Sequence, residues 1–127
     1  MGTLVVVNSG GSTSDLSTRA RSSIEELDAC RLQERFAGLG LTHIGEAPER
    51  QPVRLAGEIR GTRHSGYDDA PLLAVTVDDG TGSALVVFSG RRRIRGLDAG
   101  RTVIIEGVGR RQRGQLVVHN PAYTLLT

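Results

Sequence analysis

Five short runs of β-branched and other apolar residues follow Pro52, and glycine or polar turn residues separate each run from the next. In the first run, Val53, Leu55 and Ile59 alternate with charged residues, which predicts a strand with one face toward a core and the other toward water. An open sheet of five such strands would leave two unpaired edges, whereas a closed barrel leaves none. The pattern therefore predicts an all-β domain over residues 52–127, built as a five-stranded Greek-key barrel.

The residues between these runs predict how the strands are connected. An Asp-Asp-Gly-Thr-Gly sequence predicts a hairpin, in which Asp78 and Asp79 stabilise the turn rather than act as an acid and a base. A second hairpin is expected at residues 110–114. The polar residues 62–69 are expected to form a loop, and the segment 90–100 has room for one short helical turn at most. The five expected strands cover residues 53–59, 72–77, 84–88, 102–107 and 115–119.

One helix is expected before the barrel, over residues 24–37. Ser23 and Glu26 have the capping-box spacing, and Gly38 and Gly40 can end the helix. Its apolar positions follow an approximate helical period through Ile24, Leu27, Cys30, Phe36 and Leu39. The chain is thus expected to have three parts: a flexible N-terminal arm, or a segment foreign to the native protein, over 1–22; the helix and an extended connection over 23–51; and the barrel over 52–127.

The composition excludes most common routes to catalysis. The chain has 127 residues, enough for one domain, and its 16 basic side chains are all arginines. Without lysine, the chain has no phosphate-binding lysine of a P-loop, no lysine that could form a Schiff base and no Ser-x-x-Lys nucleophile pair. Cys30 is alone and the three histidines lack metal-ligand spacing, so we expect no catalytic residue, no metal and no cofactor. We find no membrane-spanning run and no signal peptide, and therefore expect a cytoplasmic protein.

Charge is unevenly distributed along the chain. Residues 1–49 carry four arginines and seven acidic residues, for a net charge of −3, whereas residues 50–127 carry twelve arginines and seven acidic residues, for a net charge of +5. An anionic partner is therefore expected on the C-terminal part of the chain.

The pattern of the barrel region also resembles the nucleic-acid-binding OB-fold family, the type shared by tRNA-anticodon and replication proteins. The similarity extends over roughly residues 50–124 and is carried by the segments 53–59, 75–83, 87–88, 97–103, 106–108 and 118–123. The ending His119-Asn120-Pro121-Ala122-Tyr123 is similar to that of the wedge domain of fork-remodelling branch-migration helicases. The stretch from Phe88 to Leu97 resembles small stand-alone OB-fold proteins of high-GC actinobacteria. The resemblance implies an OB-fold barrel that binds nucleic acid and does no ATP-driven work.

An OB-fold usually binds its ligand across its second and third strands, between the loop that joins strands one and two and the loop that joins strands four and five. Both loops are rich in arginine, which contacts phosphate and stacks on bases. The alternative is that a chain without lysine carries arginine in any exposed loop. The Arg91–Arg95 cluster fits a phosphate ligand, a solvated loop or an acidic protein partner. The predicted nucleic-acid-binding residues are Arg54, Arg60, Arg63, His64, Tyr67, Arg91, Arg92, Arg93, Arg110, Arg111 and Arg113.

Aromatic residues are few, so weak or structure-directed binding is expected. Phe88 is in phase with core positions and is expected to be buried. Tyr67 is the candidate to stack on a base, and Tyr123 is expected to pack against the barrel and close it.

These observations predict a non-catalytic protein that binds single-stranded or junction DNA, or RNA, and no membrane. If about four to six phosphates are neutralised, the log–log salt slope is roughly −3 to −4. The alternative is a protein-interaction module that docks a partner through the helix 24–37 or the Arg91–Arg95 cluster, with the barrel as scaffold. The nucleic-acid prediction requires the two arginine-bearing hairpin ends to flank one common cleft.

Overall fold

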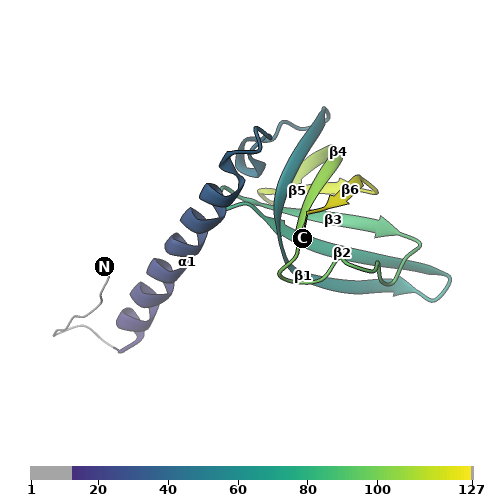
Figure 1. The fold of residues 1–127 in the computed structure, drawn as a ribbon. Coiled ribbons are helices and arrows are strands. Elements are labelled where there is room, and N and C mark those ends of the chain that lie inside the picture. Colours follow the sequence, from purple (N-terminus) through teal and green to yellow (C-terminus); the bar gives the residue numbers. More distant parts are fainter. Residues whose placement is uncertain (1–12, 127) are drawn as a thin grey trace.

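The computed structural model describes residues 13–126, which form one helix and a six-stranded sheet (Figure 1). No helix among these residues has the length and apolar character needed to cross a membrane. The elements are α1 (Thr13–Ala37), the short 3-10 helix η1 (Ile44–Glu46), β1 (Pro52–Tyr67), β2 (Ala70–Asp78), β3 (Ser83–Ser89), β4 (Thr102–Gln112), β5 (Gln115–His119) and β6 (Ala122–Leu125).

Five of the strands close into a barrel. Hydrogen bonding follows the order β1-β2-β3-β5-β4, and the first half of β1 pairs with β4 to close the ring. All these pairs are antiparallel except β3 with β5, which is parallel. The closed five-stranded barrel is therefore present as predicted. The additional strand β6 pairs with β4 and was not expected, because its four residues are too few to show an alternating pattern.

The barrel core is sealed at its two ends by segments that are not strands. Ile44 and Ala47, in and just after η1, are buried beside the turn between β2 and β3. Ile94 and Leu97, from the segment between β3 and β4, are buried at the opposite end, near the start of β2. The segment between β3 and β4 contains no helix, which agrees with the expectation of one short helical turn at most.

The polar residues 62–69 do not form the predicted loop. Instead β1 continues to Tyr67 and turns through Asp68 and Asp69 directly into β2. Backbone pairing with β2 continues to the pair Tyr67 and Ala70, so ladder hydrogen bonds stabilise this hairpin although its side chains are mostly polar. Pattern-based prediction underestimates such strands because it depends on apolar alternation.

The helix begins at Thr13, eleven residues before the expected start. Neither glycine nor proline interrupts residues 13–23, so nothing in this segment stops the helix from extending toward the N-terminus. Residues 13–22 therefore belong to α1, while residues 1–12 lie outside the described part of the chain. The buried helix residue is Leu32, at 1% exposure, whereas Ile24 and Leu27 are exposed. The predicted apolar stripe is thus wrong, because the helix touches the barrel only near its C-terminal end (Figure 1).

Candidate nucleic-acid interface

The outward side of the barrel carries a shallow surface that crosses five strands. Alternation along β2 and β3 places Val75 and Val86 inside the barrel and their neighbours outside. One outward row follows the cross-strand pairing through Gly61, Thr76, Leu85, Val117 and Arg110. Two adjoining hollows lie along this row, and we call them together the outer groove. It is lined by Gly61, Thr62, Arg63, Ala74, Thr76 and Leu85, and by Arg50, Val108, Arg110, Gln112, Val117 and His119.

Arg63 and Arg110 lie at opposite ends of the outer groove. Arg63 is on β1 and Arg110 on β4, with β2, β3 and β5 between them. Four interstrand spacings of about 4.8 Å separate the outer strands, or roughly 19 Å along the sheet. Within residues 23–126, no carboxylate lies within ion-pair distance of either guanidinium. The two arginine-bearing strand ends therefore line two different hollows of the outer groove, with their charges available to a ligand.

Two further predicted residues extend this surface at its ends. Tyr67 is 79% exposed at the end of β1, and its alternation with Arg63 places it on the same outward side. Arg113 is exposed in the two-residue turn between β4 and β5, next to the groove residue Gln112.

Arg111 points the other way from Arg110. It pairs with the buried Leu116, on the inward side of β4, and its Nη2 donates to the carbonyl oxygens of Ile44 at 2.7 Å and Ala47 at 3.2 Å. Its backbone N–H donates to Oε1 of Glu49 at 2.7 Å. The guanidinium of Arg111 thus holds η1 on the end of the barrel and does not face the outer groove.

Arg54 and Arg60 are held by carboxylates. The Nε of Arg54 lies 2.7 Å from Oε1 of Glu106, across the pair of β1 and β4. Arg60 forms ion pairs with Glu58, at 3.0 Å, and with Asp28 of α1. The structure therefore does not bring these two predicted residues into the outer groove.

His64 and the arginines after β3 gather on the other side of the β1–β2 hairpin. His64 pairs with the buried Leu73, on the inward side, and lines a separate cleft with Arg92 and Arg93. Nη2 of Arg92 is 2.7 Å from Oδ1 of Asp68 at the hairpin tip. Arg91 is exposed on the same segment. This second set of predicted residues is thus separated from Arg63 by the hairpin itself.

Two aromatic residues belong to the barrel rather than to the outer groove. Phe88 is buried in the core, as expected, and Tyr123 on β6 packs edge-on against it, with ring centroids 5.7 Å apart. No Phe, Tyr or Trp is among the described residues that line the outer groove, so the rings available for stacking are Tyr67 at its rim and the imidazole of His119.

The structure adds two residues that the sequence pattern did not indicate. Arg50 precedes the first strand and joins the groove because its N–H donates to the carbonyl oxygen of Gly109, 2.9 Å away. His119 ends β5, beside Val117. The sequence contains no signal for Arg50, since the contact joins segments about sixty positions apart.

The predicted turn role of the two aspartates between β2 and β3 is confirmed. Asp78 accepts from the N–H of Gly80 at 2.7 Å, and Asp79 accepts from the N–H and hydroxyl of Thr81 at 2.9 and 2.6 Å. The other oxygen of Asp79 accepts from the N–H of Ile44 at 2.9 Å, which fixes η1 to this turn. These contacts give both carboxylates a structural role, in the turn and in holding η1 to it.

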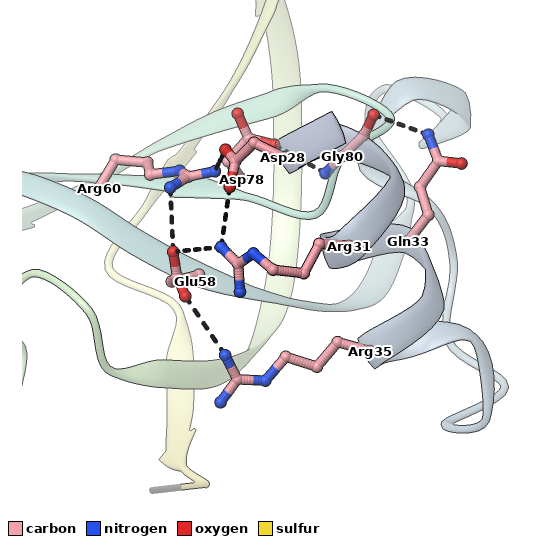
Figure 2. A network of polar contacts seen from close by, with 8 residues as sticks. All are labelled: Asp28, Arg31, Gln33, Arg35, Glu58, Arg60, Asp78 and Gly80. Carbon is pink, nitrogen blue, oxygen red and sulfur yellow. Dashed lines mark hydrogen bonds and ion pairs between the residues drawn. The ribbon is translucent and has the colours of Figure 1, made fainter. Parts of the chain in front are cut away.

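A network of charged side chains joins α1 to the barrel (Figure 2). Glu58, whose side chain is 12% exposed, accepts from Arg31 at 3.4 Å, Arg35 at 3.3 Å and Arg60 at 3.0 Å. Asp28 pairs with Arg31 at 2.9 Å and with Arg60. These contacts hold the C-terminal part of the helix against β1.

This network predicts that helix docking depends on pH. The hydrogen bond from Arg31, with a further contribution from Arg60, holds the pKa of the Asp28 carboxyl below its ordinary value. A depressed carboxyl pKa stabilises the docked state above the ordinary pKa, and this contribution is lost as the pH falls through the lowered value. A fluorophore on Cys30, the single cysteine and exposed on α1, should therefore lose anisotropy below about pH 4. Constant anisotropy until the barrel itself unfolds would contradict the prediction.

No protein-family model and no curated protein matches the chain. Among solved structures, the second OB-fold domain of replication protein A from Methanococcus maripaludis has a TM-score of 0.51 at 13% identity, over 67% of this chain and 93% of that domain. A structure of RecG bound to a three-way DNA junction has a TM-score of 0.50 at 17% identity; the match covers 60% of this chain but only 11% of the RecG chain. These similarities and the strand order confirm the predicted OB-fold barrel with an N-terminal helix.

Proposed function

We propose that the protein binds nucleic acid along the outer groove and catalyses no reaction there. The observation that carries this proposal is that Arg63 and Arg110 line the two hollows of the outer groove, without ion-pair partners among residues 23–126. The solved neighbours with this fold include a domain of replication protein A and a protein bound to a DNA junction, which supports the same choice of ligand.

The chemistry of the surface favours contacts to the phosphate backbone. Arginine binds phosphate through its planar fork, and four arginines, Arg50, Arg63, Arg110 and Arg113, lie in or beside the groove. The floor consists of short or aliphatic side chains such as Thr76 and Leu85, which can contact sugars and base edges but offer no ring for stacking. Binding affinity is therefore dominated by charge.

The first test is the salt dependence of binding to a single-stranded DNA of about 16 nucleotides. Four neutralised phosphates on a single strand give a log–log slope of about −3, so the affinity should fall about 50-fold between about 50 and 200 mM salt. Fluorescence anisotropy of the labelled strand measures this slope. RNA of the same sequence and a three-way DNA junction, titrated in parallel, establish which nucleic acid is preferred.

One observation favours the alternative of a protein-interaction module. Ile24 and Leu27 are 67% and 71% exposed at helix positions three residues apart, on the part of α1 that projects from the barrel. A folded chain that binds none of the three nucleic acids at about 50 mM salt would rule out the proposed function and favour this alternative.

A further inference from the structure

We propose that Arg50 and Arg113 are ligand-binding residues, placed where the backbone disfavours arginine, and that with Arg110 they grip consecutive phosphates at the β4–β5 end of the outer groove. We call these three residues the phosphate anchor. The proposal rests on the proposed function, since it assigns the strongest contacts of the same site.

The backbone at both positions is in the left-handed region. The φ angle is 61° at Arg50 and 52° at Arg113. This conformation crowds the Cβ atom and is populated mainly by glycine, asparagine and aspartate. Among residues 13–126, Asn120 is the one other non-glycine residue with positive φ. Arginine therefore stands at two positions where the fold alone favours other residue types.

The turn at Arg113 shows this conflict most clearly. Gln112 pairs with Gln115, so Arg113 and Gly114 form a two-residue hairpin loop, and both have positive φ. Such a loop prefers Asn-Gly, because asparagine tolerates the left-handed conformation. Arginine at the first position of this loop adds positive charge at the end of the groove but lowers the stability of the turn.

The loop that carries Arg50 is held by its backbone and by its neighbour. The N–H of Arg50 donates to the carbonyl oxygen of Gly109, and Glu49 accepts from the N–H of Arg111. Neither contact uses the side chain of Arg50, which instead lines the hollow that contains Arg110, Val108 and Val117. The structure therefore gives this guanidinium no role in holding the loop.

The three guanidinium groups are unneutralised. None of the three has an acidic partner within ion-pair distance in the described part of the chain. Like charges gathered at one hollow repel one another until a polyanion neutralises them. Three of the four groove arginines lie at this end, and Arg63 alone lies at the other. The phosphate backbone of a bound nucleic acid is therefore bound mainly at the β4–β5 end.

The test uses substitutions that favour the backbone while they remove the charge. Arg50→Gly and Arg113→Asn each supply a residue type suited to positive φ, so the melting temperature is expected to stay the same or rise. Each is expected to weaken binding to the single-stranded DNA about fivefold at about 0.1 M salt, with the slope shallower by about 0.7. The double variant should bind about 25-fold more weakly. Arg95→Gln removes an equal charge from the opposite end of the barrel and serves as the control, with an expected change of less than about twofold.

The outcomes separate the two proposals. Reduced affinity with retained or increased melting temperature supports the phosphate anchor. Unchanged affinity in both single variants overturns it, even if loss of Arg63 and Arg110 still abolishes binding and the proposed function stands. A loss of affinity as large in Arg95→Gln would also overturn it, because the effect would then reflect net charge alone. Failure of the unmodified chain to bind DNA or RNA removes the proposed function and the anchor with it.

Discussion

The double charge reversal R63E/R110E is expected to weaken binding to single-stranded DNA by more than about 25-fold at about 0.1 M salt. Removing two phosphate contacts accounts for about 25-fold, because each contributes about 0.7 to the log–log slope. Two carboxylates at the ends of the outer groove would add repulsion against the strand. Both side chains lie on the outward side of the barrel without ion-pair partners among residues 23–126, so their reversal should leave folding intact.

The neutral variant R63Q/R110Q is the matched comparison. It should show the loss of about 25-fold without the added repulsion, and its slope should be about −1.4 instead of about −3. Circular dichroism and the melting temperature establish that both variants are folded. Wild-type affinity in a folded R63E/R110E variant would show that nucleic acid does not use this surface.

Substitution of Arg111, the next residue along β4, should have the opposite effect: it should lower the melting temperature and leave the affinity for single-stranded DNA nearly unchanged. Arg111→Gln is expected to lower the melting temperature by roughly 10 °C, since it removes charge-assisted hydrogen bonds to two carbonyl groups at the end of the barrel. Loss of these bonds at the fully buried Ile44 costs on the order of 2 kcal/mol. Below the melting transition, the affinity for single-stranded DNA should stay within about twofold of wild type.

Differential scanning fluorimetry and anisotropy together distinguish the two roles of Arg111. Because Arg111→Gln and Arg110→Gln remove the same charge from adjacent positions, each is the control for the other. An Arg111→Gln variant with unchanged melting temperature and clearly weakened binding would place this guanidinium in the groove instead of beneath η1.

These two neighbours show what could be predicted from the sequence and what could not. The hairpin and the barrel followed from alternation and turn residues, and the loop rich in arginine was found where OB-folds bind their ligands. Whether Arg110 or Arg111 faces outward depends on the register of β4 against β5, which the Arg-Arg-Gln-Arg sequence does not show. A shift of one residue would exchange their roles.

Contacts between distant segments were beyond prediction for the same reason. Arg60 resembles a free loop arginine in the sequence, yet Asp28 from α1 neutralises it. Arg50 resembles a linker residue, yet a hydrogen bond to Gly109 brings it to the groove. Tertiary contacts decide which arginines are neutralised and which remain on the outward face, and so they decide the candidate site. Local secondary-structure propensity does not predict these contacts.

Under the proposed function, the floor of the outer groove has a kinetic consequence, because Thr76, Leu85 and Val117 stand where many single-strand binders place rings. A strand held mainly by guanidinium groups can step from one phosphate to the next with little unstacking of bases. Such a protein would diffuse along its nucleic acid, bind without sequence preference and dissociate quickly in competition with a tighter binder. It would protect exposed strands for short times and would not form long-lived complexes with them.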